Sequence, residues 1–176
     1  MFKRLMEGRR EDAGFTLIEL MVVVLIIGIL IAIGLPTFLG ARTRAQNRAA
    51  QADLRNALVA AKTMYSDNSS YALANETAVT GLVSVEPSLC YVAAGTAALA
   101  SGQTCISGAN TGGGTSVSAA ATTWGAARMS ASTTCYLIRD TASGGTTYGS
   151  TTTAANCTGT YAAANATAAS PSTGGW

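Results

Sequence analysis

The most constraining feature of this chain is a long apolar stretch close to its first residue. Residues 20–41 are 22 consecutive positions without a charge, and most of them are Val, Ile or Leu. Crossing the hydrocarbon core of a bilayer takes about 20 predominantly apolar residues in a helix. A helix from Phe15 to Tyr65 would be about 75 Å long. Such a helix is too long for one small domain, so its front half must be buried elsewhere.

Two ordinary explanations of this stretch compete. A removable secretory signal has an apolar region of only about 7–15 residues and a small-residue cleavage site, whereas this stretch is longer and residues 33–36 suit cleavage poorly. A single-pass membrane anchor is the stronger alternative. Basic residues flank the stretch evenly, so the positive-inside rule does not set its orientation. They are Lys3, Arg4, Arg9 and Arg10 before it, and Arg42, Arg44, Arg48 and Arg55 after it.

Two residues at the front of the stretch do not suit an ordinary anchor. Gly14 stands where the charged leader meets the apolar residues, and Glu19 follows five residues later. A carboxylate inside a membrane helix is costly and indicates function. Cleavage after Gly14 would give Phe15 an α-amino group, near the level of Glu19 in a neighbouring subunit staggered by about one step. A buried charge is tolerated when it is paired; an unpaired acid near the membrane interface is the alternative.

The order of these residues resembles the class III signal of bacterial type IV pilins. Gly14-Phe15-Thr16-Leu17-Ile18-Glu19 precedes the apolar stretch, and Ala32-Ile33-Gly34-Leu35-Pro36 extends the likeness over about a third of the chain. The resemblance implies that a prepilin peptidase cuts after Gly14 and methylates the amine of Phe15. It also implies that subunits wait in the cell membrane and are then drawn by the inner-membrane assembly machinery into a homopolymeric helical filament.

Each role that the resemblance implies has a physical basis. Gly14 has no side chain, so the peptidase can approach its backbone closely. Phe15 supplies a bulky apolar first residue, and Glu19 is the expected partner of the incoming Phe15 amine, which would set axial register. Pro36 lacks an amide hydrogen, so the helix is expected to kink or melt between Gly34 and Gly40. Close helix packing is an equally good explanation of the glycines.

The second half of the helix, residues 41–65, is amphipathic. Its apolar stripe is expected to pack on the C-terminal domain. A separate basic stripe is expected to be a solvated face or to contact acidic groups of neighbouring subunits, and DNA binding is the weaker alternative. The apolar stripe is Leu54, Leu58, Ala61 and Tyr65 with Ala50, Ala57 and Met64 beside it; the basic stripe is Arg44, Arg48, Arg55 and Lys62.

All four cysteines lie beyond the apolar stretch. From Tyr91 onward, 62 of 86 residues are Ala, Gly, Ser or Thr, and a domain so poor in large apolar side chains needs cross-links. Disulfides form in oxidising compartments, so they place the domain outside the cytoplasm. Three pairings are possible. We favour Cys90–Cys105 and Cys135–Cys157, which are separated by 15 and 22 residues.

Short strand signals complete an α+β prediction. Residues 89–92 and 115–119 each favour a strand, and residues 124–131 and 134–139 favour a hairpin. After Asp140 the pattern decays, so a loop held by Cys157 is expected. The resulting expectation is a type IV pilin fold, a long helix packed on a small antiparallel sheet with disulfide-stapled loops. Its parts are a removed cytoplasmic leader (1–14), a membrane and filament-core helix (15–41), its amphipathic continuation (42–65) and an extracellular β-rich domain (66–176).

The composition narrows the function further. The chain has no His, and its net charge is +2, so His-based catalytic sites and His-ligated zinc are excluded and nucleic-acid binding by bulk charge is not indicated. We therefore expect no enzyme activity, no cofactor and no metal. The expected function is that of a major pilin. The alternatives are a minor pilin for DNA uptake and a type II secretion pseudopilin, although only Asp140 could supply a carboxylate ligand for calcium beyond residue 90.

Overall fold

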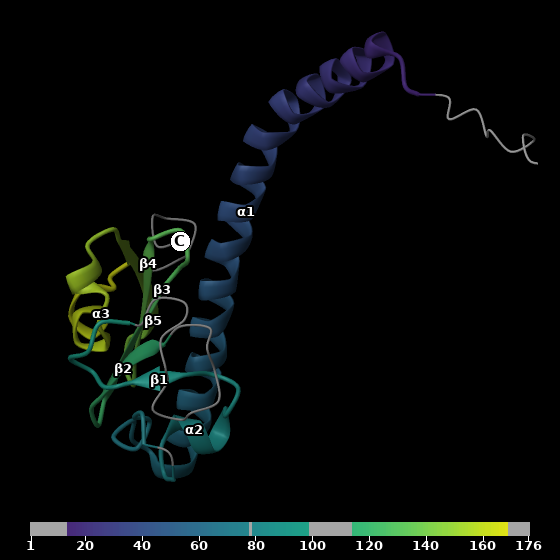
Figure 1. The fold of residues 1–176 in the computed structure, drawn as a ribbon. Coiled ribbons are helices and arrows are strands. Elements are labelled where there is room, and N and C mark those ends of the chain that lie inside the picture. The colour runs from purple at the N-terminus through teal and green to yellow at the C-terminus, as the bar shows by residue number, and fades with distance from the viewer. Residues whose placement is uncertain (1–13, 78, 99–113, 169–176) are drawn as a thin grey trace, which may run out of the picture. The chain divides into compact units, whose positions relative to one another are not determined.

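The computed structural model describes residues 14–77, 79–98 and 114–168, and the chain divides into two compact units, up to Ala41 and from Arg42 onward. The long helix α1 (Leu17–Asn68) contributes to both units (Figure 1). In the first unit every described side chain from residue 14 to residue 39 is exposed. The described part of this unit is therefore mainly an apolar helix without a buried side chain.

Pro36 lies inside α1, which continues past it as a helix. Proline donates no backbone hydrogen bond. The hydroxyl of Thr37 donates to the carbonyl oxygens of Ile33 and Gly34 at 3.1 and 3.0 Å, so carbonyls in this turn have additional partners. Local melting between Gly34 and Gly40 upon assembly stays a prediction, because the structure contains a single subunit.

The second unit holds a five-stranded sheet whose strands follow one another in chain order. Strands β2 to β5 pair in antiparallel fashion, whereas β1 pairs with β2 in parallel. Two short helices and a 3₁₀ turn complete the unit. The elements are α2 (Leu82–Val85), β1 (Tyr91–Val92), β2 (Thr115–Ala119), β3 (Thr123–Met129), β4 (Cys135–Thr141), β5 (Gly145–Thr151), η1 (Ala154–Asn156) and α3 (Gly159–Asn165).

The expected α+β class is confirmed, with two differences. First, the sheet is mixed, because β1 runs parallel to β2. Second, the expectation of a loop after Asp140 is wrong, since β5 pairs with β4 along its whole length and α3 follows. Tyr148 is the large apolar side chain of β5, and the strand otherwise contains Thr, Ser and Gly. Backbone pairing with β4 therefore forms this strand, and such pairing leaves no hydrophobic pattern in the sequence.

The second half of α1 covers one face of the sheet, and the short helix α3 covers the other (Figure 1). Alternate residues of a strand point to opposite faces. Accordingly, Tyr136 and Ile138 of β4 join the core beneath α1, while Cys135 and Leu137 join the core beneath α3. The predicted apolar stripe of α1 is confirmed. Its buried members are Ala50, Leu54, Ala57, Leu58, Ala61 and Met64, joined by Ala60, and Tyr65 is partly buried.

A disulfide joins β4 to the start of the α3 segment. Cys135 and Cys157 are bonded, with their Cα atoms 5.7 Å apart, which confirms this half of the favoured pairing. Both residues are fully buried. None of the described cysteines is a free thiol, Cys90 included. The predicted partner of Cys90 is Cys105, which lies outside the described residues.

Candidate functional site

The residues around the predicted cleavage point form a compact hydrogen-bonded group at the start of α1. The backbone N–H and the hydroxyl of Thr16 both donate to Oε2 of Glu19, at 2.8 and 2.6 Å. The N–H of Glu19 donates back to Oγ1 of Thr16 at 3.3 Å. This reciprocal pattern is a capping box, which satisfies amide groups that the first turn of a helix leaves without partners.

Thr16 takes part in this group, although the sequence analysis gives it no role of its own. Thr16-Leu17-Ile18-Glu19 has the spacing of a capping box, and that signal is visible in the sequence alone. The Glu19 carboxylate is consequently held toward the N-terminal end of α1, where the predicted cleavage would place the amine of Phe15.

The apolar surface of this unit is extensive and exposed. Phe15 is 89% exposed, and the large apolar side chains from Leu17 to Leu39 are between 47% and 75% exposed. The described part of the chain has one helix, α1, that is long and apolar enough to cross a membrane. A Cβ added at Gly28 or Gly34 would meet no atom within 4 Å. Any packing role of these glycines must therefore involve another molecule.

The basic stripe of α1 splits into two groups in the structure. At one end, Nζ of Lys62 lies 3.2 Å from Oδ1 of Asp140, which is buried in β4. Asp140 also accepts hydrogen bonds from the hydroxyl of Tyr71 and, at 2.5 Å, from that of Thr146. This end of the stripe therefore attaches α1 to the sheet. At the other end, Arg44 and Arg48 remain exposed.

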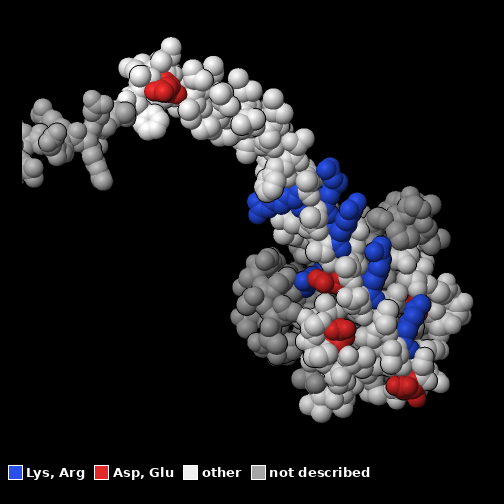
Figure 2. All heavy atoms as spheres, turned by 90° about the vertical axis from the view of Figure 1, so that its right-hand side faces the viewer, with Lys and Arg blue, Asp and Glu red and all other residues white. Residues whose placement is uncertain are grey.

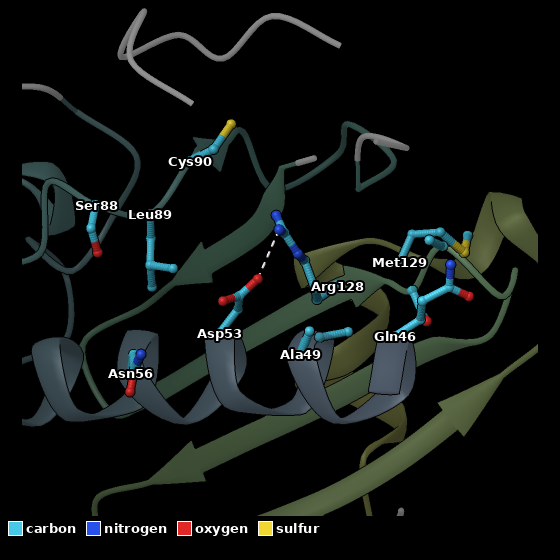
Figure 3. Close-up of a pocket in the computed structure, with 12 residues that line it drawn as sticks. Gln46, Ala49, Asp53, Asn56, Ser88, Leu89, Cys90, Arg128 and Met129 are labelled. Atoms are coloured by element: carbon cyan, nitrogen blue, oxygen red, sulfur yellow. Dashed lines mark ion pairs between the residues drawn. The ribbon is translucent and has the colours of Figure 1, made fainter. Parts of the chain in front are cut away.

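A second ion pair lies in a hollow of about 380 Å³ between α1, residues 88–90 and the β3–β4 hairpin (Figure 3). Nη2 of Arg128 contacts Oδ2 of Asp53 at 2.8 Å. Burial raises the pKa of the Asp53 carboxyl, and the Arg128 guanidinium opposes that rise. Burial likewise lowers the pKa of Arg128, against the attraction of Asp53. The two charges compensate each other, so the hollow contains a structural ion pair between α1 and β3.

The predicted site residues fall into separate places. Gly14, Phe15 and Glu19 lie together at the start of α1, and the Gly34 to Gly40 segment lies within the same helix. The described cysteines belong to the second unit. Across the described ranges, no group of three His, Cys, Asp or Glu side chains could hold a metal ion.

The comparisons with known proteins concern this N-terminal segment. Residues 9–35 match the model of the prokaryotic N-terminal methylation motif. This match, the capping box and the exposed apolar helix define residues 9–35 as a prepilin-type N-terminal methylation segment. The fold, a long N-terminal helix on a mainly antiparallel sheet, is consistent with a type IV pilin.

Individual relatives agree with that class. The type IV major pilin protein PilA of Myxococcus xanthus is 43% identical over 67 residues, which are 38% of this chain and 30% of PilA. The type IV wide pilus major component PilA4 of Thermus thermophilus is 44% identical over 62 residues, 35% of this chain and 47% of PilA4. The type II secretion system core protein G of Pseudomonas aeruginosa is 45% identical over 64 residues, 36% of this chain and 44% of that protein.

The chain spans less than half the length of each of these curated relatives. No solved structure matches it. The similarity therefore characterises the methylation segment and its helix.

Proposed function

We propose that this chain is a structural subunit, a major pilin, that polymerises into an extracellular type IV pilus and is not an enzyme. The observation that carries the proposal is the match of residues 9–35 to the methylation motif, on the part of α1 whose large apolar side chains, up to Leu39, are all exposed. Apolar area on that scale must be removed from water by a bilayer or by other subunits. Named relatives that are major pilins support the same assignment.

The proposed life of the subunit has two stages. As a precursor it spans the cell membrane once, with its leader in the cytoplasm and residues from Arg42 onward outside. A prepilin peptidase then cuts between Gly14 and Phe15 and methylates the new amine. The inner-membrane assembly machinery moves the helix from lipid into the filament core, where neighbouring helices of the same chain replace the lipid.

Glu19 is the proposed registration residue in this assembly. Its carboxylate accepts two hydrogen bonds from Thr16, which hold it at the start of α1. In the filament, the amine of an incoming Phe15 would approach this carboxylate and compensate its charge. An uncompensated charge in an apolar core is strongly unfavourable, so subunits out of register would be disfavoured.

A pseudopilin of a type II secretion system is the second candidate, and the identity to core protein G favours it. A minor pilin of a DNA-uptake filament is the third, for which the basic stripe is the relevant feature. The proposed subunit of a surface pilus differs from both in abundance, since it should be the main component of filaments released by shearing.

The decisive experiment combines electron microscopy and mass spectrometry of sheared surface filaments. Abundant filaments made of this chain, with an N-terminal peptide that begins at methylated Phe15, are expected. A minor component of filaments built from another protein would favour the third candidate. Retention of the chain in the cell envelope, without surface filaments, would favour the pseudopilin. An assembled chain that still begins at Met1 would contradict the proposed processing.

A further inference from the structure

Three arginines follow the apolar stretch closely in α1. Arg42, Arg44 and Arg48 are exposed, and none of them has an ion-pair partner among the described residues. The segment from residue 42 to residue 52 contains no Asp or Glu. Three positive charges are therefore concentrated in two turns of α1 without any compensating charge on that segment.

These charges follow the apolar stretch within a few turns of helix. At about 1.5 Å per residue, Arg42, Arg44 and Arg48 follow Ala41 by roughly 2, 5 and 11 Å along the helix axis. The headgroup region on each side of a bilayer is about 5–8 Å thick. Helical side chains tilt toward the N-terminus, so Arg48 reaches back toward the apolar residues. Long basic side chains near the end of a membrane helix extend in this way into the headgroup layer.

The charges also lie on opposite sides of the helix. Arg42 and Arg44 are two positions apart, which places them about 200° apart around the axis, while Arg44 and Arg48 share one side. Figure 2 agrees, because the first basic side chains after the apolar part of α1 project to both sides of it. An acidic patch on a neighbouring protein would meet one side of a helix. Lipid headgroups surround a membrane helix on all sides.

We propose that Arg42, Arg44 and Arg48 form an arginine collar that binds the headgroups of anionic phospholipids around the membrane-resident subunit. The proposal rests on the membrane stage of the proposed function. Each basic residue near an anionic surface strengthens association by roughly fivefold, and the effect decays within a Debye length. The collar thus attracts anionic lipid to the outer end of the apolar helix and resists deeper insertion of the helix.

The test is lipid selectivity of the full chain reconstituted in phosphatidylcholine vesicles. Electron paramagnetic resonance with spin-labelled phosphatidylglycerol or phosphatidylcholine measures the relative association of each lipid with the protein. The wild-type chain should favour phosphatidylglycerol, and added salt should weaken that preference. Arg44→Gln and Arg48→Gln should each reduce it by up to roughly fivefold, and in the triple variant with Arg42→Gln the two lipids should associate about equally.

Arg55→Gln is the matched control, because it removes the same charge from the same helix side about 21 Å beyond Ala41, outside the headgroup layer. It should leave the preference unchanged. Equal preference in wild-type and triple-variant protein, or an equal loss with Arg55→Gln, would overturn the collar. The collar would also be overturned if the triple variant kept the lipid preference of the wild type but formed fewer filaments on cells, since that result indicates an acidic protein partner.

The design separates this inference from the proposed function. Co-flotation with phosphatidylcholine vesicles reports insertion, and far-UV circular dichroism checks that each variant is folded. A wild-type chain that fails to insert would contradict the membrane stage and therefore also the collar. A wild-type chain that inserts without preferring phosphatidylglycerol would contradict the collar alone.

Discussion

At the residue scale, the Thr16–Glu19 pair combines two tasks in one short motif. The Glu19 carboxylate caps the helix through Thr16, and in the proposed filament it also receives a subunit's amine. The two tasks are physically different. Capping needs a hydrogen-bond acceptor, whereas charge compensation needs a negative charge, so substitutions can separate them.

Glu19→Ala should abolish filament assembly and leave membrane insertion intact, because the charge that fixes register is removed while the apolar helix is kept. Glu19→Gln should also impair assembly, since its amide oxygen can still accept from Thr16 but carries no charge. The measurement is filament number in electron micrographs, alongside the amount of subunit in the membrane fraction.

Thr16→Val is the complementary control for this pair. It removes the hydroxyl of the capping box and keeps the charge of Glu19, so assembly should persist. Wild-type filament numbers in Glu19→Gln would contradict the pairing of Glu19 with the Phe15 amine, and would leave helix capping as the role of this residue.

Two buried tyrosines make contrasting predictions for stability. The hydroxyl of Tyr91 is buried and has no hydrogen-bond partner among the described residues, whereas that of Tyr71 donates to the buried Asp140. Tyr91→Phe should leave stability unchanged or raise it by about 1 kcal/mol, because it removes an unsatisfied polar group. Tyr71→Phe should destabilise the domain by about 1–3 kcal/mol. Urea unfolding of the full chain in detergent measures both.

Tyr91 also predicts a loss of stability in alkali. Burial, with smaller contributions from the carboxylates of Glu86 and Asp53, raises the pKa of Tyr91 well above its ordinary value of 10.0. The unfolded chain therefore ionises first, so stability is full below pH 10.0 and falls as the pH rises further. Tyr91→Phe should make that fall shallower. An equally steep fall in this variant would show that Tyr91 does not contribute to it.

At the element scale, α3 is held against the sheet by close contact with β3. A Cβ added at Gly125 would lie 2.5–2.7 Å from atoms of Ala163 in α3, closer than van der Waals contact allows. The hydroxyl of Thr158 also caps α3 by accepting from the N–H of Tyr161. Small residues therefore allow a seven-residue helix to pack on a strand without large apolar side chains.

Gly125→Ala should destabilise the domain by about 1–3 kcal/mol, because the added methyl group forces α3 away from β3. Gly149→Ala in β5 is the matched control. Its added Cβ would have its nearest neighbours at 3.4–3.6 Å, so little change is expected. Unfolding midpoints in urea compare the two variants, and equal midpoints would contradict the close-contact explanation.

At the scale of the whole molecule, the two units meet different requirements. In the first, none of the described apolar side chains is buried, and in the proposed function a bilayer or other subunits cover them. The second has its own core in two layers, one of which is small and contains the Cys135–Cys157 disulfide. A cross-link is most valuable where few apolar side chains are available.

Replacing Cys135 and Cys157 together by Ala should lower the free energy of unfolding by about 2–5 kcal/mol. The double replacement leaves no unpaired thiol at this site. Urea unfolding followed by tryptophan fluorescence measures the loss. Reduction of the wild-type chain, which also breaks the disulfide of Cys90, should lower its stability at least as far as the double replacement does. A variant as stable as the oxidised wild type would show that the core beneath α3 does not depend on the cross-link.

Much of this architecture was predictable from local sequence patterns. The apolar stripe of α1 follows helical periodicity, and β2 and the β3–β4 hairpin follow strand alternation. Strand β5 and helix α3 were missed, since Thr, Ser, Gly and Ala dominate both segments. Their formation depends on pairing with β4 and on packing against the sheet, which are long-range interactions.

The methylation segment, the apolar helix and the capping box can be recognised from the chain of amino acids alone, because each consists of nearby residues whose chemistry acts locally. Which charges of α1 serve the fold depends on tertiary contacts. Lys62 pairs with Asp140 across 78 residues, while Asp53 pairs with Arg128, which comes from β3. The same structure leaves Arg42, Arg44 and Arg48 exposed. Helical spacing places several of these residues on one stripe, and only the position of the folded sheet distinguishes them.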